Sequence, residues 1–231
     1  PSRFLGVDGC RNGWLAVSWD GGSSASAVIY PAFADILKLD HQFIAIDVPI
    51  GLPDWIEKGG RTCERLARAI LKTRASSIFS SPARAVLAAQ TYAEARALNA
   101  QASAGIKMSA QGFGILAKIR EVDETITPAD QTRISETHPE LIFVLMNGQT
   151  PLAHGKKTPE GKAERRALLA KAGFPLGNLD IPPKSSGWGE DDLLDACACA
   201  WSAKRLATGA GLRLPEMPEY DARGLRMEIC G

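Results

Sequence analysis

The chain has 231 residues, of which 45% are hydrophobic, and a formal net charge of +1 at pH 7. A chain of this size can bury a large core, so we expect a single domain over residues 1–231, with a helical insertion around residues 61–125. The near-zero charge excludes a general attraction to nucleic acid, which requires an excess of basic residues. Charge is instead segregated: basic residues gather between Arg61 and Arg74, and acidic residues gather between Glu190 and Asp195.

The cysteines and the hydrophobic runs bear on the cellular compartment. The five cysteines are an odd number and contain no CxxC pair, which argues against a disulfide framework and against a zinc site. The amino-terminal residues PSRFLGVDG have no charged region followed by a long apolar one, and no apolar run is long enough to cross a bilayer. We therefore expect a reducing, cytoplasmic location, without export or membrane insertion.

The chain begins with a series of short strands. Apolar stretches separated by glycine-containing turns occupy residues 4–8, 14–19 and 25–30. Consecutive short strands of this kind form an antiparallel meander. Asp8 ends the first strand, and Gly6, Gly9 and Gly13 around it are expected to leave the backbone open to a ligand.

The remaining elements alternate between helices and strands. The apolar stretch 43–48 predicts a strand that is buried on both faces and ends near Asp47. Helices are predicted over residues 33–39, 61–72, 84–102, 111–123, 156–171 and 190–207, and further strands over residues 132–138 and 224–229. This order predicts an α/β fold with a mixed sheet, in which the antiparallel meander is followed by parallel strands, and helices on both faces.

Basic residues recur on one face of the helix predicted over residues 61–72. These residues are Arg61, Arg65, Arg68 and Lys72. The face is either a solvated surface or a stripe that contacts phosphate groups. The next stretch, RASSIFSSPAR, adds Arg74, four serines and Arg84. Its composition suits an anion-binding loop, although serine-rich stretches are usually only loops.

Acidic residues open the last predicted helix, in the stretch EDDLLDACACAWSA. Asp192 and Asp195 are three residues apart and therefore share a helical face. Acids at a helix amino terminus favour the macrodipole, which accounts for Asp192 better than for Asp195. The small residues that follow Asp195 allow the helix to pack close to a sheet. An aspartate at that margin is partly buried and needs a partner, for which a divalent cation is suited.

Four carboxylates can therefore meet, from two strand ends and one helix. Asp8, Asp47, Asp192 and Asp195 are oxygen ligands of the kind that hold two Mg²⁺ or Mn²⁺ ions for phosphoryl transfer. Two roles are open for Arg11, in the turn after Asp8. It either anchors a substrate phosphate or neutralises the acids when no metal is bound.

The sequence resembles the family of unknown function DUF429 in blocks that run through nearly the whole chain. These blocks are GVDGCRNGW, IDVPIGLP, RTCERLAR, SSIFSSPAR, ETHPE, KKTPEGKAERRALL, DDLLDACACAW and GLRMEI. The segment DLLDACACA is also similar to the last helix of RuvC-type Holliday-junction resolvases. The resemblance implies an RNase H-like fold and a nuclease with Asp8, Asp47, Asp192 and Asp195 as metal ligands. One departure is the lack of a second acid beside Asp47.

The block ETHPE belongs to the family pattern but not to the minimal metal set. Glu136 or Glu140 could complete a second metal site, and His138 could transfer a proton near the scissile phosphate. A histidine that precedes proline at a strand end often only hydrogen-bonds the neighbouring backbone, so both interpretations of His138 stay open.

The leading hypothesis is a nuclease that depends on Mg²⁺ or Mn²⁺ and binds nucleic acid. Its candidate phosphate contacts are Arg11, Arg61, Arg65, Arg74 and Arg84. One alternative is an ATPase or kinase of the actin-like group, which shares the sheet topology. The chain is short for two actin-like half-domains and lacks a second glycine-rich phosphate loop. The other alternative is a non-catalytic module that binds nucleic acid or protein.

Overall fold

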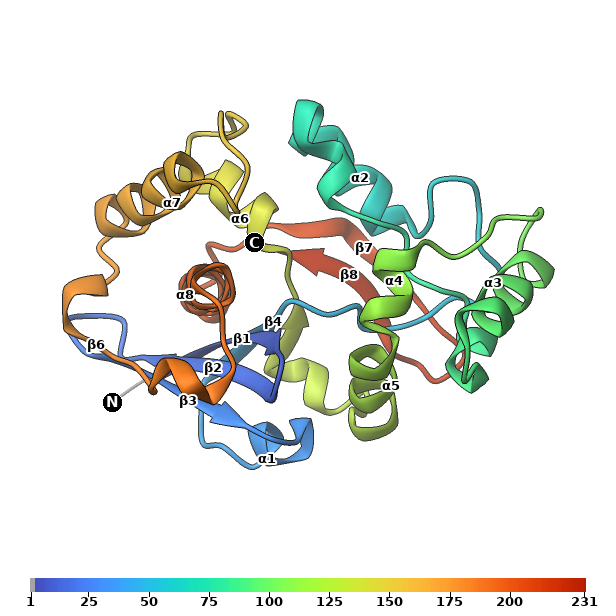
Figure 1. Ribbon diagram of the computed structural model, residues 1–231, viewed down its shortest axis with the longest axis horizontal. Coiled ribbons are helices and arrows are strands. Elements are labelled where there is room, and N and C mark those ends of the chain that lie inside the picture. Colours follow the sequence, from blue (N-terminus) through green and yellow to red (C-terminus); the bar gives the residue numbers. More distant parts are fainter. Residues whose placement is uncertain (1–2) are drawn as a thin grey trace.

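The computed structural model describes residues 3–231, and its main feature is a six-stranded mixed sheet with the order β5-β4-β1-β2-β3-β6 (Figure 1). The strands are β1 (Phe4–Cys10), β2 (Gly13–Trp19), β3 (Ala25–Tyr30), β4 (Phe43–Ile46), β5 (Ile134–Glu136) and β6 (Leu179–Asp180). The first three form an antiparallel meander. β4 pairs in parallel with β1, β5 with β4, and β6 with β3. The predicted mixed sheet is therefore confirmed.

Helices cover both faces of this sheet, as predicted. They are α1 (Phe33–Leu37), α2 (Thr62–Leu71), α3 (Tyr92–Gln101), α4 (Ala110–Gly114), α5 (Leu116–Thr125), α6 (Pro139–Met146), α7 (Pro159–Lys171) and α8 (Glu190–Ala207). Short 3-10 helices are η1 (Lys72–Ser77), η2 (Arg84–Ala88), η3 (Asp130–Thr132), η4 (Leu176–Asn178) and η5 (Lys184–Ser186). α8 packs on β1, β2 and β4, and α6 and α7 pack on α8. α1 and α5 cover the opposite face.

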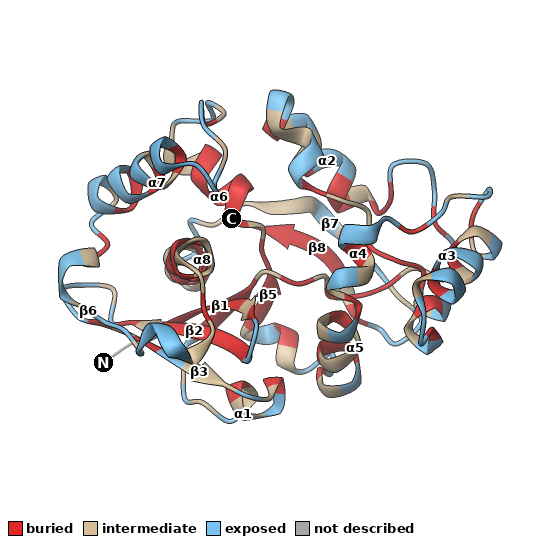
Figure 2. Cartoon of the chain, in the orientation of Figure 1, coloured by how far each residue is buried: buried red, intermediate tan, exposed pale blue. Residues whose placement is uncertain are grey.

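The alternation of side chains along the strands divides the core between these two faces. The face under α8 carries Phe4, Leu15, Val17, Trp19 and Phe43, and the other face carries Leu5, Val7, Trp14, Ile44 and Ile46. α8 itself is buried along most of its length, as Figure 2 shows in red. A helix buried on most sides has to be apolar all round, which the run of alanines and cysteines after Asp195 satisfies.

Gly6 is the point at which α8 comes closest to the sheet. A Cβ atom at Gly6 would lie 2.8 Å from the Cα of Ala200, and closer still to the Ala196 carbonyl oxygen. At Gly13, φ is 138° and a Cβ would overlap the carbonyl oxygen of Tyr30. The expectation that these two glycines leave the backbone open to a ligand is therefore wrong. Both are required by packing within the protein.

Several helices differ from those predicted. The stretch 84–102 divides into η2 and α3, because a capping box starts a new helix at Thr91: its hydroxyl accepts from the Glu94 amide, and the Glu94 carboxylate accepts from the Thr91 amide. The stretch 111–123 divides into α4 and α5 at Ile115, which has φ −108° and ψ 5°. α6 lies where no element was predicted.

A second, two-stranded antiparallel sheet is formed by β7 (Arg213–Tyr220) and β8 (Arg226–Cys230). α2 packs on it. β8 matches the strand predicted over residues 224–229, whereas β7 was not predicted. Pro215 and Pro218 obscure β7 in the sequence, since proline cannot donate to a strand ladder.

A third, smaller hydrophobic cluster lies away from the two that flank the main sheet. It contains Ile56, Ala83, Val86, Ala89, Ala95, Met108 and Leu116. These residues come mostly from the stretch predicted as an insertion around residues 61–125. The division of the chain into one domain with an insertion stays a prediction. Along the described part of the chain, none of the helices combines the length and hydropathy needed to span a bilayer.

Gly6→Ala is expected to lower the free energy of unfolding by about 3 kcal/mol, because the new methyl group meets helix backbone that no side-chain rotation can move. Gly9→Ala, on the same strand, is the matched control. The atom nearest to its Cβ belongs to the Lys118 side chain, at 3.8 Å, so the change should stay within about 0.5 kcal/mol. Urea unfolding followed by circular dichroism measures both, and equal losses would contradict the argument.

Candidate functional site

A cavity of about 600 Å³ opens at the carboxyl ends of the parallel strands β1, β4 and β5. Its acidic lining residues are Asp8, Asp47, Glu64, Glu136, Glu140, Asp192 and Asp195. Its basic lining residues are Arg61, Arg74, Lys118, Lys156 and Arg165, and His138 lies among them. The opposite wall is made by η1, the residues that follow it, and α4 and α5. The cavity thus gathers acids from distant parts of the chain.

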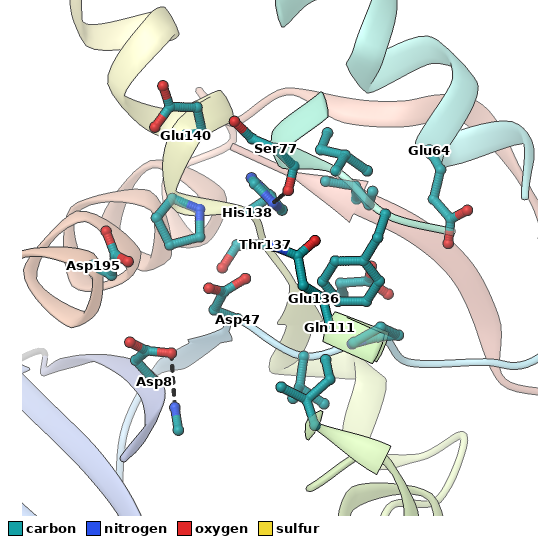
Figure 3. Close-up of a pocket in the computed structure, with 18 of the residues that line it drawn as sticks. Asp8, Asp47, Glu64, Ser77, Gln111, Glu136, Thr137, His138, Glu140 and Asp195 are labelled. Atoms are coloured by element: carbon teal, nitrogen blue, oxygen red, sulfur yellow. Dashed lines mark hydrogen bonds between the residues drawn. The ribbon is translucent and has the colours of Figure 1, made fainter. Parts of the chain in front are cut away.

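Asp8, Asp47 and Asp195 point toward one common space (Figure 3). Asp8 lies on the face of β1 that α8 covers, because it alternates in phase with Gly6. Asp47 directly follows β4, and its amide donates to the carbonyl of Val7 at 3.0 Å, which aligns the two strand ends. Asp195 lies in the second turn of α8 above them. The structure therefore brings three of the four predicted ligands together.

Burial and mutual repulsion disfavour the charged forms of these three carboxylates. Burial raises the pKa of Asp8 well above its usual value, and the neighbouring charges of Asp47 and Asp195 raise it further. Burial also raises the pKa of Asp47 and that of Asp195 to about 6 each. In both cases Lys156 acts in the opposite direction. The arrangement is therefore costly to the protein at neutral pH.

Few cations or hydrogen-bond donors offset the cost of burying these three carboxylates together. The Lys156 ammonium donates to Asp195 Oδ2 at 2.7 Å, and the Gly9 amide donates to Asp8 Oδ1 at 2.7 Å. Within residues 3–231, no group donates a hydrogen bond to the Asp47 carboxylate, and Lys156 is the one cation paired with any of the three acids. Lys156 was not among the sequence candidates, although the KK pair of the block KKTPEGKAERRALL marks its position.

Asp192, the fourth predicted ligand, lies at the margin of the cavity. Its Oδ2 accepts from the Gly189 amide at 2.8 Å, which stabilises the first turn of α8. Its charge also adds to those that raise the pKa of Asp8. Asp192 therefore caps the amino terminus of α8 and contributes negative potential to the site.

Arg61 is buried, not presented on a phosphate-facing surface. Its guanidinium pairs with Glu136 at 2.5 Å and with Glu64 at 2.8 Å, and it also donates to the carbonyls of Ile50 and Gly51. The Glu136 carboxylate additionally accepts from the Ile50 amide at 2.7 Å. The expected stripe of phosphate contacts is therefore wrong for Arg61, because two buried carboxylates and two carbonyls take up its donors.

The other predicted arginines lie in different surroundings. Arg65 is exposed and donates to the Gly60 carbonyl and to Thr62. Arg84 pairs with Asp123 at 2.8 Å and also with Asp221, outside the cavity lining. Arg11 is exposed, in the turn between β1 and β2, and is likewise outside the lining. Arg74 is the predicted arginine that lines the cavity without being buried.

Glu140 pairs with a buried arginine that the sequence did not single out. Arg165 Nη2 lies 2.6 Å from Glu140 Oε2, whereas Glu140 Oε1 is buried without a hydrogen-bond partner in the described residues. Arg74 Nε lies 3.8 Å from that Oε1 and donates to the Leu152 carbonyl. Glu136 and Glu140, the two candidates for completing a second metal site, are thus both paired with arginines.

The surroundings of His138 are compatible with both predicted interpretations, a backbone hydrogen bond and proton transfer. Its Nε2 lies 3.3 Å from the Ser77 carbonyl oxygen, which can only accept, so Nε2 carries the proton and Nδ1 has a free lone pair. Nδ1 is buried without a hydrogen-bond partner among residues 3–231. Burial lowers the pKa of the imidazole, which keeps it neutral at pH 7. The backbone contact is present, and the ring is also in the correct state to accept a proton.

The oxygen donors of the cavity suit a divalent cation in kind, although within residues 3–231 they are not arranged as a preformed metal site. In the described part of the chain, no group of three or more His, Cys, Asp or Glu side chains is arranged to hold a metal ion. The chemistry of the donors nevertheless fits Mg²⁺ or Mn²⁺, since carboxylate oxygens are their usual ligands and the Asp47 carboxylate is without a hydrogen-bond donor. The contact between Lys156 and Asp195 occupies part of this set.

Fold and site together define a mixed α/β protein with an acidic cavity at the carboxyl edge of its main sheet. The model of the family described as "Protein of unknown function (DUF429)" matches residues 6–220, and the chain belongs to this family. No curated protein and no solved structure matches it. The resemblance to DUF429 is thereby confirmed, and the relation to RNase H-like proteins and RuvC-type resolvases stays a prediction.

Arg61→Leu is expected to lower the free energy of unfolding by about 3–5 kcal/mol, because Glu64 and Glu136 would be left buried without their cation. Arg65→Leu, one helical turn along and exposed, should change it by no more than about 0.5 kcal/mol. Chemical denaturation of both variants tests this, and a loss of similar size in Arg65→Leu would show that Arg61 has no special role.

Asp47→Asn is expected to stabilise the metal-free protein at neutral pH. The pKa of Asp47 is about 6 in the folded protein and near 3.8 when unfolded, so the folded state binds more protons between these values. The contribution of Asp47 to the free energy of unfolding is therefore fully present below pH 3.8 and is lost as the pH rises through about 6. Asparagine does not ionise, so Asp47→Asn avoids that loss. The free energy of unfolding is expected to rise by about 2 kcal/mol at pH 7.5 and not to change at about pH 4.

Urea titrations in EDTA at those two pH values measure the gain. Asp54→Asn is the control, because Asp54 is exposed in the loop that follows Asp47. A gain of equal size at both pH values would rule out titration of Asp47 as its source.

Proposed function

We propose that this protein is a phosphodiesterase acting on nucleic acid, a nuclease that depends on Mg²⁺ or Mn²⁺. The observation that carries the proposal is the convergence of Asp8, Asp47 and Asp195 from two adjacent parallel strands and the helix that crosses them. Buried acids that raise one another's pKa are costly unless a cation is bound. A divalent cation removes that cost and is the usual means of activating phosphodiesters.

The order of the elements supports an RNase H-like assignment. An antiparallel meander comes first, parallel strands follow, and a long final helix crosses the sheet. The acids lie on the first strand, after the fourth strand and on that final helix. RuvC-type resolvases, to which the DLLDACACA segment is similar, take their metal ligands from the equivalent elements. Both the fold relation and the activity are part of the proposal.

In this proposal Asp8 and Asp47 hold the cation, and Asp195 and Asp192 add negative potential beside them. When bound, the ion supplies Lewis-acid activation of the phosphate and of an attacking water. Arg74 binds phosphate oxygens, since neither of its terminal nitrogens donates to a group in residues 3–231. His138 would accept, at the free lone pair of Nδ1, the proton that the attacking water loses.

The size of the cavity limits the substrate. A volume of about 600 Å³ lies within the range of sites for small molecules and single cofactors. One or two nucleotides of a single strand fit such a space, whereas a continuous duplex would have to lie across its opening. We therefore propose single-stranded segments or chain ends as the substrates.

The test compares single-stranded, duplex and branched DNA and RNA in the presence of Mn²⁺. The native chain is expected to cut single-stranded or frayed substrates, and Asp8→Asn to cut them at least about 100-fold more slowly, since it removes a ligand of the cation. Asp54→Asn serves as the control with native activity.

The absence of cleavage on every substrate, or an Asp8→Asn variant as active as the native chain, would overturn the proposal. Binding of nucleic acid that survives replacement of both Asp8 and Asp195, without cleavage, would favour the non-catalytic module.

A further inference from the structure

Lys156 reaches into the group of acids from outside the main sheet. It lies between α6 and α7, and its Nζ is 2.7 Å from Asp195 Oδ2. The Asp195 side chain is 2% exposed, whereas the Lys156 side chain is 43% exposed. Asp8 and Asp47 also experience its charge, which lowers the pKa of each against the effect of burial. One ammonium group therefore contacts Asp195 directly and also favours the charged forms of Asp8 and Asp47.

The backbone on both sides of Lys156 is anchored. Before it, the amides of Ala153 and His154 donate to the Glu164 carboxylate at 3.0 and 3.2 Å. After it, the Thr158 hydroxyl accepts from the Gly161 amide at 3.0 Å and caps α7. A segment held in this way positions the lysine instead of leaving it to a free loop.

The other basic residues of the cavity are engaged elsewhere. Arg61 pairs with Glu64 and Glu136, Arg165 pairs with Glu140, and Lys118 donates to the Gly13 carbonyl at 2.7 Å. The terminal nitrogens of Arg74 donate to no group in residues 3–231, but its Nε is directed to the Leu152 carbonyl and to Glu140. In the part of the chain that the structure describes, Lys156 is thus the one cation that pairs with any of the three aspartates.

The charges of the group set how many ions it can take. Asp8, Asp47 and Asp195 carry three negative charges when ionised, and Lys156 carries one positive charge. One divalent cation together with the ammonium balances these three carboxylates, and Asp192, at the margin, accepts from the Gly189 amide instead. A second divalent ion would have to displace Lys156 from Asp195 or be placed beside it, where like charges repel.

We propose that Lys156 is the built-in second cation of this site: the protein binds a single divalent ion at Asp8 and Asp47, and the Lys156 ammonium on Asp195 takes the place of the other. This inference rests on the proposed metal-dependent function and revises the expectation of two metal ions. Lys156 is a positioning residue in this arrangement, because it sets the charge and the occupancy of the site.

The test is the number of Mn²⁺ ions bound, measured by isothermal titration calorimetry and by metal analysis after gel filtration. The native protein is expected to bind one ion. Lys156→Met, which removes the charge and keeps most of the volume, is expected to bind two. Lys157→Met is the matched control with one ion, since Lys157 is exposed and pairs with none of the acids in the described residues. Lys156→Arg, which retains the charge, should also bind one.

Circular dichroism confirms that each variant is folded, and Lys156→Gln replaces Lys156→Met if the latter is not. Two ions in the native protein, or one ion of unchanged affinity in both uncharged variants, would overturn the inference while leaving the proposed function intact. If the native protein binds no Mn²⁺ at all, the proposed function fails, and that result is distinguishable from a wrong ion count.

Discussion

The contact between α8 and β1 is the constraint on which the rest of the site depends. Gly6 lets the helix backbone come against the strand, and the small residues Ala196 and Ala200 are the side of α8 that makes this approach. A strand and a helix packed this closely have little freedom to slide. Asp195, one residue before Ala196, is therefore held above Asp8, which lies two residues beyond Gly6. Packing within the core thus sets the separation of these two acids.

The remainder of the cavity is organised by ion pairs that differ in kind from this group. Arg61 and Arg165 are buried with their carboxylate partners, so Glu64, Glu136 and Glu140 are each held in an ion pair within the protein. The acids near α8 share one half-exposed lysine instead. The cavity therefore contains two kinds of carboxylate: those held in buried ion pairs, and those left free to bind a ligand. The number of acids alone would not show which is which.

Local patterns predicted the elements well, and long-range pairing was the part that they could not supply. Alternation and turns identified the first three strands, and the apolar stretch before Asp47 identified the fourth. The meeting of Asp8 with Asp47 follows from parallel strands that share an edge. The partners of Arg61 and Asp195 lie far along the chain, and no local pattern specifies them. After Glu140, α6 is apolar all round and so has no periodicity to detect, whereas the helix start at Thr91 is marked in the sequence by the spacing of Thr91 and Glu94.

The position of α8 late in the chain affects how the protein is made. The face of β1 that carries Asp8 and Phe4 is covered by α8, which is synthesised after all six strands of the main sheet. Until α8 emerges from the ribosome, that apolar face has no native partner, and contacts so distant in sequence form slowly. The early strands are thus exposed to association with other chains during synthesis. Asp8 and Asp47 can meet as soon as β1 pairs with β4, but Asp195 joins them only when α8 docks, so the catalytic centre proposed above is completed late.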